Sequence, residues 1–490
     1  MKMPGATKYL SAALAAALVL AAGCRSPNSP SGPGEIWDPP EWEKDSQADD
    51  PVWAALREKK FDSSRPLTLA DCLKIALRNN PSSRKAWQET RGAEAELKQA
   101  RSQWYPTLTL SGEASYLKQN FKLKNEELPD PDTDQLTYGP NLKITYLLLD
   151  LGGRSGAIEE ALQQLLAANY EFNRSIQDLL LDVEKAYHGF YSSRAGLDAA
   201  RADLRDSETG REAARQKFKV GLVSKLDELQ AQSSYDESLY ELEAAREAFK
   251  TARAAVARVI GLPADAEFEI QEPSNEPPGD ISRAEVSELI EEGMRKRPDI
   301  AALRATLRAK EAAVKAAASE LWPDLSVGGE ANKYWYQYYG ENEPYEDSYE
   351  YSGYLSIGWE IFSGFSNLNR KRAAAAEAEA VREELREAEL AASAEVWTQY
   401  YAFNAAVGKY KSSRALLASA QASYDLALEG YKTGLKSILD LLTAQSRLSG
   451  ARSKLIGSRK DVFIALAELA HATGSLGIEK TAGGAEVNDR

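Results

Sequence analysis

Two copies of one motif decide the fold of this chain. The stretch FKVGLVSKLDELQAQS at 218–233 recurs as YKTGLKSILDLLTAQS at 431–446, an offset of 213 residues. In each copy a glycine stands between two long segments that contain no proline and are rich in Ala, Glu, Leu, Lys and Arg. Glycine permits a tight reversal of the chain, and the flanking residue types favour helix. The motif therefore predicts two long helical hairpins that turn at Gly221 and Gly434.

The repetition continues upstream of the two motifs. At an offset of 217 residues, Asn80-Pro81 corresponds to Arg297-Pro298, and Trp-Tyr-Pro at 104–106 corresponds to Leu-Trp-Pro at 321–323. The difference between the two offsets makes the first copy four residues longer ahead of its long helix. The chain is therefore predicted to contain two tandem repeats rather than separate domains.

Both repeats are expected to have the same internal order. Repeat 1 is placed at 66–265, repeat 2 at 281–475, and a linker at 266–280. Proline suits the first turn of a helix and stops the helix before it. We expect a short helix and then a proline-initiated helix in each repeat, at 68–79 and 82–103, then at 282–296 and 299–320. The long run from 154 to 216 would form a helix of about 95 Å at the standard rise, longer than a compact globular domain accommodates.

Alternating stretches between the helices predict two strands in each repeat. They fall at about 106–118 and 136–150, then at about 323–338 and 350–362. Apolar side chains occupy every second position, as in a half-buried soluble strand or a strand that faces lipid. The runs approach the length of a tilted transmembrane strand, and polar loops and many tyrosines flank them. Four such strands cannot close a barrel, so a membrane-spanning sheet would require a homo-oligomer.

The N-terminus has the features of an export signal. Lys2 and Lys8 precede an apolar run that ends in Ala22-Gly23-Cys24. The sequence around Cys24 resembles a bacterial lipobox, which implies cleavage after residue 23 and attachment of lipid to the Cys24 thiol. The alternative is an ordinary signal peptide that contains a cysteine. Residues 24–65 contain six prolines and are predicted to be an extended strap, and the tail at 476–490 is predicted to be disordered.

Composition excludes several classes of function. The formal net charge of −14 argues against a nucleic-acid partner, and two Cys and two His offer little for a metal or nucleophilic site. Cys72 is interpreted as a small buried residue, His188 as a packing residue, and His471 has no evident partner. No nucleotide, hydrolase or metalloprotease motif is present. We therefore expect no enzyme activity, no metal site and no cofactor other than lipid on Cys24.

The order of these features resembles the TolC-like outer-membrane efflux proteins, in their lipoprotein branch. The resemblance covers roughly residues 66–473 and rests on the doubled hairpin motif, the two helix-to-strand breaks, and the returns DLGGR at 150–154 and FSGF at 362–365. It implies a mainly α protein with a transmembrane β-barrel. Three chains would supply a 12-stranded barrel and a 12-helix periplasmic tunnel. It also implies docking to a periplasmic adaptor and an inner-membrane transporter of the RND, ABC or MFS class.

The resemblance assigns roles to individual residues. The hairpin turns would meet the adaptor, and a ring formed by Leu439 and Asp440 would narrow the periplasmic mouth. Clustered carboxylates would raise the pKa of Asp440, although Thr443 stands where relatives often carry a second acid. The residues of the turns are Val220, Gly221, Leu222, Ser224, Thr433, Gly434, Leu435 and Ser437. The helix–strand breaks are Pro106, Pro323, Gly152, Gly153 and Gly364.

Two functions are compatible with these features. The first is a passive outer-membrane exit duct for efflux or type I secretion. The alternative is a lipid-anchored periplasmic coiled-coil scaffold whose strands form a soluble sheet.

Overall fold

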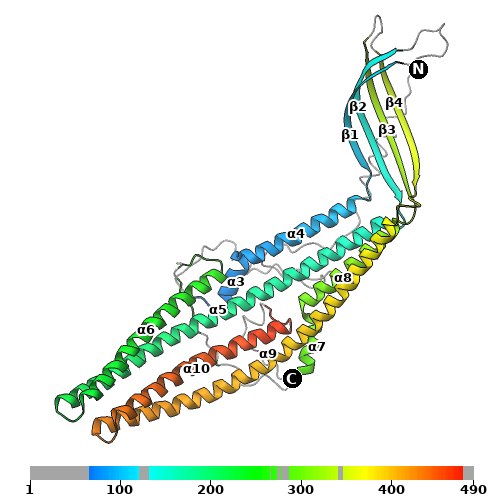
Figure 1. Ribbon diagram of the computed structural model, residues 1–490. Helices are drawn as coiled ribbons and strands as arrows, with labels where there is room; N and C mark the ends of the chain where they lie inside the picture. Colours follow the sequence, from blue (N-terminus) through cyan, green and yellow to red (C-terminus); the bar gives the residue numbers. More distant parts are fainter. Residues whose placement is uncertain are drawn as a thin grey trace, which may run out of the picture. The chain divides into compact units, whose positions relative to one another are not determined.

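The two repeats fold into the same succession of elements in a computed structural model (Figure 1). The structure describes residues 66–120, 132–264, 266, 268–272, 276, 286–339 and 346–477. Repeat 1 contains α3 (Leu69–Asn79), α4 (Pro81–Ser102), β1 (Thr107–Asn120), β2 (Asp132–Leu149), α5 (Gly153–Lys219) and α6 (Lys225–Val259). Repeat 2 contains α7 (Val286–Lys296), α8 (Pro298–Ser319), β3 (Asp324–Tyr338), β4 (Glu346–Gly358), α9 (Ser366–Thr433) and α10 (Ile438–Ala472).

The chain divides into two compact units. The described part of the first, the sheet unit, is drawn from Gly92–Leu166 and Ala305–Glu383. That of the second, the hairpin unit, is drawn from Ser29–Arg91, Ala167–Arg304 and Glu384–Arg490. Each unit therefore takes material from both repeats.

The sheet unit contains one antiparallel sheet in the order β1-β2-β3-β4 (Figure 1). Two hairpins, β1–β2 and β3–β4, come from successive repeats, and β2 pairs with β3 between them. Within these four strands, β1 and β4 each have one edge that pairs with no strand of the same chain.

Two strand boundaries differ from the expectation. β2 begins at Asp132 rather than about 136, because Asp132 is still opposite Asn120 of β1. β4 spans Glu346–Gly358 rather than 350–362. It ends where it does because Gly358 lies opposite Asp324, the first residue of β3, so no residue of β3 remains for pairing beyond it. Alternation along one strand could not reveal either limit.

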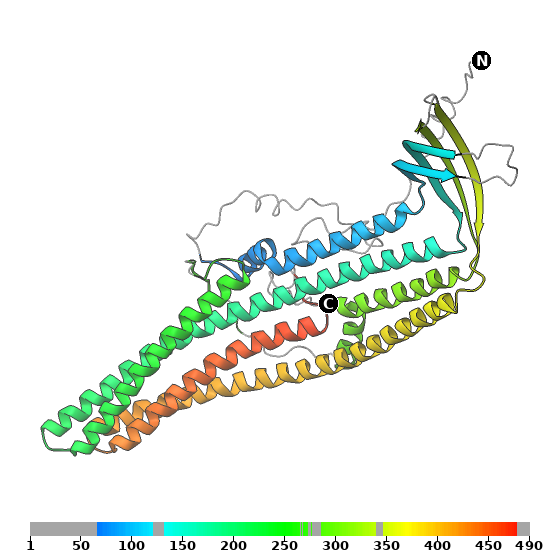
Figure 2. The ribbon, with the colours of Figure 1, turned by 45° about the horizontal axis from the view of Figure 1, so that its top comes forward.

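In the hairpin unit, α5 and α10 lie between α6 and α9 away from the turns (Figures 1 and 2), and near the turns one apolar cluster joins all four helices. The largest core cluster joins α3, the middle of α5 and the C-terminal end of α6, with Phe172, Ile176, Leu180 and Ile260 almost fully buried. Part of the predicted linker joins this core, since Ile270 is buried and forms a parallel bridge with Leu67. Leu476, expected in the disordered tail, is also buried here.

Capping side chains fix where three of the helices begin. Thr68 caps α3 with a reciprocal pair of hydrogen bonds to Asp71, and the same capping box recurs at α6 and α10. Among the helices that the structure describes, none combines the length and apolar character needed to cross a membrane.

Candidate functional site

The two hairpin turns have nearly identical backbones. Gly221 has a φ of +74° and Gly434 a φ of +86°, a region that residues with a Cβ rarely adopt. Leu222 donates its N–H to the Lys217 carbonyl at 2.9 Å, and Leu435 donates to the Gly430 carbonyl at 2.7 Å. Gly221 also donates to the Phe218 carbonyl at 3.0 Å and Gly434 to the Tyr431 carbonyl at 3.1 Å, and together these bonds form the closing motif in which a left-handed glycine ends a helix. Both glycines therefore turn the chain as the sequence predicts.

A serine starts the second helix of each hairpin. The Ser224 N–H donates to Asp227 at 2.9 Å, and the Ser437 N–H donates to Asp440 at 3.0 Å. The aspartate N–H groups donate back to the serine hydroxyls. These bonds from Ser437 hold the pKa of Asp440 below its usual range, the opposite direction to that expected for a ring of carboxylates. Within one chain, Asp440 is thus the capping-box partner of Ser437, the N-cap of α10. The constriction formed with Leu439 stays a prediction.

Around the turns, apolar side chains are exposed. Val220 is 69% exposed, Leu222 72% and Leu435 83%. Leu226 and Leu439, each one position ahead of the capping aspartate, are similarly exposed. Thr433 uses its hydroxyl to bond the Glu429 carbonyl at 2.9 Å. An exposed apolar cluster on rigid helix ends is typical of a protein-docking surface.

The sheet has one apolar and one polar face. On the apolar face, Leu108 is opposite Ile144, which in turn is opposite Gly329, while Val327 is opposite Leu355. Large apolar side chains on this face are exposed, among them Leu108, Leu110, Ile144, Leu355 and Ile357. The opposite face carries a Lys143–Glu330 ion pair at 2.9 Å and a hydrogen bond between Asn141 and Asn332. A sheet with these two faces suits a lipid boundary on one side and water on the other.

The predicted breaks lie at the junction of helices and strands. Pro106 and Pro323 stand between a helix end and a strand start, and Gly152 and Gly364 have positive φ values of 113° and 63°. At Gly153, an added Cβ would lie 2.7 Å from the Ser319 hydroxyl. All five residues thus lie at the helix–strand junctions, where the sequence placed them.

Buried polar side chains secure the same junction. Arg154 is 4% exposed and donates to the Leu147 carbonyl at 2.7 Å and to the Gln103 carbonyl, at the end of α4, at 3.5 Å. Its counterpart in repeat 2, Asn367, donates to the Glu320 carbonyl at 3.2 Å after α8. Different side chains therefore satisfy corresponding helix-end carbonyls in the two repeats.

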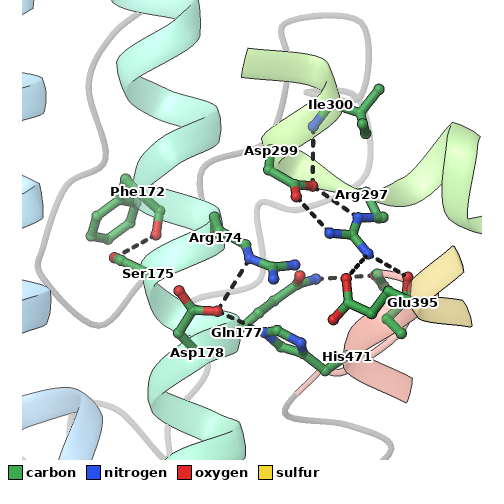
Figure 3. A network of polar contacts seen from close by, with 12 residues as sticks. Phe172, Arg174, Ser175, Gln177, Asp178, Arg297, Asp299, Ile300, Glu395 and His471 are labelled. Carbon is green, nitrogen blue, oxygen red and sulfur yellow. Dashed lines mark hydrogen bonds and ion pairs between the residues drawn. The ribbon is translucent and has the colours of Figure 1, made fainter. Parts of the chain in front are cut away.

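A second buried network lies in the hairpin unit (Figure 3). Arg297 donates to Asp299 at 2.7 Å, to Glu395 at 2.6 Å and to the Ala472 carbonyl, at the end of α10, at 3.1 Å. Burial alone would raise the pKa of Asp299, but the hydrogen bonds and charge of Arg297 outweigh burial and lower it. Arg297 thus ties α8 and α9 to the end of α10.

His471 corrects one expectation from the sequence. Its Nε2 lies 2.6 Å from the Asp178 carboxylate of α5, and Arg174 pairs with the same carboxylate at 3.1 Å. The histidine therefore has a partner that sequence reasoning missed. Since the two residues are 293 positions apart, no local signal could have revealed the contact.

The remaining candidates for chemistry are buried packing residues. Cys72 is fully buried, and burial raises the pKa of its thiol to about 12, which makes it unreactive at neutral pH. His188 stacks on Phe463 with ring centroids 4.5 Å apart. Within the described residues, no three His, Cys, Asp or Glu side chains are grouped as metal ligands. Cys24, the predicted lipidation site, lies outside the described residues.

Sequence reasoning also missed a clamp between the hairpins. Arg452 of α10 pairs with Asp203 and, at 2.8 Å, with Asp206 of α5. Ser449 donates to Asp203 at 2.7 Å. In the sequence these residues are ordinary members of charged helices, and only tertiary packing brings them together.

Comparisons with known proteins agree with this geometry. The family model described as "Outer membrane efflux protein" matches residues 72–262 and 289–475. Protein CyaE of Bordetella pertussis is 27% identical over 415 residues, which cover 84% of this chain and 85% of that protein. Outer membrane protein TolC of Vibrio cholerae is 22% identical over 424 residues, which cover 83% of this chain and 91% of that protein.

Solved structures share the fold. The outer-membrane channel OprN superposes with a TM-score of 0.72 at 20% identity, covering 87% of this chain and 96% of that chain. Because the family model matches both repeats, from α3 to the end of α10, the chain belongs to the outer membrane efflux protein family and is an outer-membrane protein.

Proposed function

We propose that this chain is the passive exit duct of a tripartite efflux or type I secretion system and works as a homotrimer. The observation that carries the proposal is the two-faced sheet, with exposed Leu110 and Ile357 on one side and the Lys143–Glu330 pair on the other. In a closed barrel the first face would meet lipid and the second would line a water-filled passage.

The unpaired edges of β1 and β4 require additional strands. Unpaired backbone groups are costly in lipid, so each edge must pair with a strand of another copy. Three copies of four strands would give a 12-stranded barrel, and three sets of four long helices a 12-helix tunnel. The trimer follows from family resemblance, whereas the need for closure follows from the sheet itself.

The partners are assigned on the same basis. The exposed turns at Val220–Ser224 and Thr433–Ser437 would dock to a periplasmic adaptor, which links the duct to an inner-membrane transporter of the RND, ABC or MFS class. Leu439 and Asp440 would narrow the periplasmic mouth, and a lipid on Cys24 would anchor the mature N-terminus.

Conductance tests the duct. Purified protein in a planar bilayer should conduct, migrate as a heat-sensitive trimer, and favour cations in a salt gradient because the chain is acidic. A lipidated protein that folds, stays monomeric and never conducts would instead support the scaffold. Mass spectrometry of the mature N-terminal peptide tests lipidation at Cys24.

Bulk at the turns tests adaptor docking. Gly221→Trp combined with Gly434→Trp should abolish transporter-dependent export while the trimer still forms. The matched control is the double alanine variant, which has the same backbone strain at positive φ but little bulk. Full export by the tryptophan variant would remove the docking role from these turns.

A further inference from the structure

A small cavity lies between α5 and α10 in the hairpin unit. Its volume is about 120 Å³, and all of its lining residues belong to these two helices. A cavity of about 150 Å³ lined by apolar side chains is large enough to bind benzene. The space between α5 and α10 is therefore of the size that suits a single six-membered ring.

The walls of the cavity are aromatic and aliphatic. Leu455 and Ile456 of α10 line it beside the ring of Phe463. The imidazole of His188 lies flat against that ring, with the two centroids 4.5 Å apart. Burial, with a smaller effect from nearby Arg459, lowers the pKa of His188 to about 4, so this imidazole is neutral at pH 7. Such walls favour contact with a flat apolar ring over contact with a hydrated ion.

Two cationic side chains border the same cavity. The side chains of Arg459 and Lys460 are 29% and 35% exposed, so both are partly shielded from water. Arg459 lies 3.9 Å from the Glu272 carboxylate and donates a long hydrogen bond of 3.4 Å to the Tyr191 hydroxyl. Lys460 pairs at 3.5 Å with Asp461, its neighbour in sequence. Because a guanidinium has five N–H donors and an ammonium three, these long contacts leave donors for a bound anion.

We infer that this cavity binds a small aromatic carboxylate, with its ring between α5 and α10 and its carboxylate against Arg459 and Lys460. An inorganic anion would leave the apolar walls without contact, and a neutral ring would make no use of the two cations. A planar carboxylate also matches the paired donors of a guanidinium. The site is complete within one chain, so the inference goes beyond the proposed duct and does not depend on it.

The repeated hairpin does not require this set of side chains. At the offset of 213 residues, Ile456 corresponds to Glu243 and Lys460 to Glu247 of α6. Both glutamates stand within a continuous helix of the same length as α10. The combination of apolar and cationic residues around the cavity is therefore particular to the pair formed by α5 and α10.

A bound carboxylate would connect the two repeats. Its ring would contact Tyr191 of repeat 1 and Phe463 of repeat 2 at the same time. A ligand that binds the folded chain and not the unfolded chain stabilises the fold by mass action. Benzoate should therefore raise the temperature at which the native chain unfolds, in a way that saturates with benzoate concentration.

Fluorine NMR of the full-length protein in detergent micelles tests the site directly. The probes are 4-fluorobenzoate and its neutral analogue 4-fluorobenzyl alcohol, each compared with protein-free micelles. The benzoate signal should shift in a saturable way, with a dissociation constant at least about tenfold below that of the alcohol, because hydrogen bonds to charged donors are the stronger ones. Benzoate binding that never saturates above the micelle background would overturn the inference.

Filling the cavity tests its location. Ala195 lines the cavity, so Ala195→Leu should abolish the saturable binding of both probes. The matched control is Ala199→Leu, one turn further along α5 and not among the lining residues, which should bind both probes as the native chain does. Helical circular dichroism verifies that both variants fold. Native binding by folded Ala195→Leu would show that the carboxylate binds elsewhere.

Removing one charge tests the chemical class of the ligand. Arg459→Gln should weaken benzoate binding by about tenfold and binding of the alcohol by less than about threefold. Exposed Lys454→Gln removes the same charge from α10 outside the cavity and should leave both constants unchanged. Equal weakening of benzoate by the two variants, or equal weakening of both probes by Arg459→Gln, would refute recognition of the carboxylate by Arg459.

Discussion

Two pairs of corresponding residues on α5 and α9 show opposite patterns of burial. Glu184 and His188 of α5 are each 7% exposed, whereas their counterparts Trp397 and Tyr401 of α9 are each 50% exposed. Folded chains usually expose carboxylates and bury large aromatic rings. The reversal shows that α5 is covered at these positions within one chain, whereas the corresponding positions of α9 are not.

The pKa values of the buried pair reflect this difference. Burial raises the pKa of Glu184 to about 7. Burial, with a smaller effect from nearby Arg459, lowers the pKa of His188 to about 4. Repeat 1 therefore carries buried titratable groups where repeat 2 has aromatic residues.

The largest expected effect on stability comes from removing the side chains that bond to the C-terminal carbonyls of α6 and α10. Asn80 donates to the Val259 carbonyl at 2.8 Å, and charged Arg297 does the same for Ala472, the residue equivalent to Val259. Arg297→Ala should lower the free energy of unfolding by about 3 kcal/mol, because buried Arg297 is the charged donor to the Ala472 carbonyl and to two half-buried carboxylates. Asn80→Ala should cost about 1–2 kcal/mol. Urea unfolding followed by helical circular dichroism measures both, and equal losses would contradict the contrast.

Glu184→Gln should remove the free-energy cost of ionising a buried carboxyl group, a group that repeat 2 replaces with Trp397. The folded-state pKa of Glu184, about 7, exceeds its ordinary value of 4.5, so its favourable contribution is complete below pH 4.5 and lost as pH rises through 7. At pH 8 the variant should be more stable by up to about 3 kcal/mol, with no gain at pH 4. Thermal unfolding at both pH values tests this, with exposed Glu237→Gln as the control.

His188→Tyr introduces the residue of repeat 2 and should act at the acidic end. The folded-state pKa of His188, about 4, lies below its ordinary value of 6.5, so the stability it contributes is present above pH 6.5 and lost as pH falls through 4. Between pH 6.5 and pH 5 the native chain should lose about 2 kcal/mol more than the variant. Parallel stability curves for the two proteins would show that His188 is not buried in its neutral form.

The smallest effect separates turn glycines from helical ones. Gly434→Ala should cost about 1 kcal/mol because Gly434 has a positive φ. Gly189→Ala introduces the residue found at the equivalent position 402 of repeat 2. Because an added Cβ at Gly189 would meet no atom within 4 Å, this variant should raise the free energy of unfolding by up to about 1 kcal/mol. Differential scanning calorimetry compares them, and a gain at Gly434 would show that the turn tolerates a side chain.

The features that could be predicted from the sequence are those that leave a periodic or repeated pattern in it. Both hairpins, both turns and all four strands follow from the doubled motif and from alternation, and the family model matches both repeats. The ends of β2 and β4 could not be predicted because the opposite strand sets them. The contacts of Arg297, Arg452 and His471 could not be predicted because each joins helices far apart in sequence.

The pairing of β2 with β3 is expected to form later in folding than the two β-hairpins. The β1–β2 and β3–β4 hairpins each join neighbouring segments, but Leu142 of β2 meets Ala331 of β3 only after α5, α6, α7 and α8 have been made. Contacts across such long loops form slowly because loop closure costs entropy. We expect pulse-labelling by hydrogen exchange to show protection first in the two hairpins and later along this central seam. The apolar face of the sheet therefore becomes one continuous surface only after the chain has been made as far as Gly358, the end of β4.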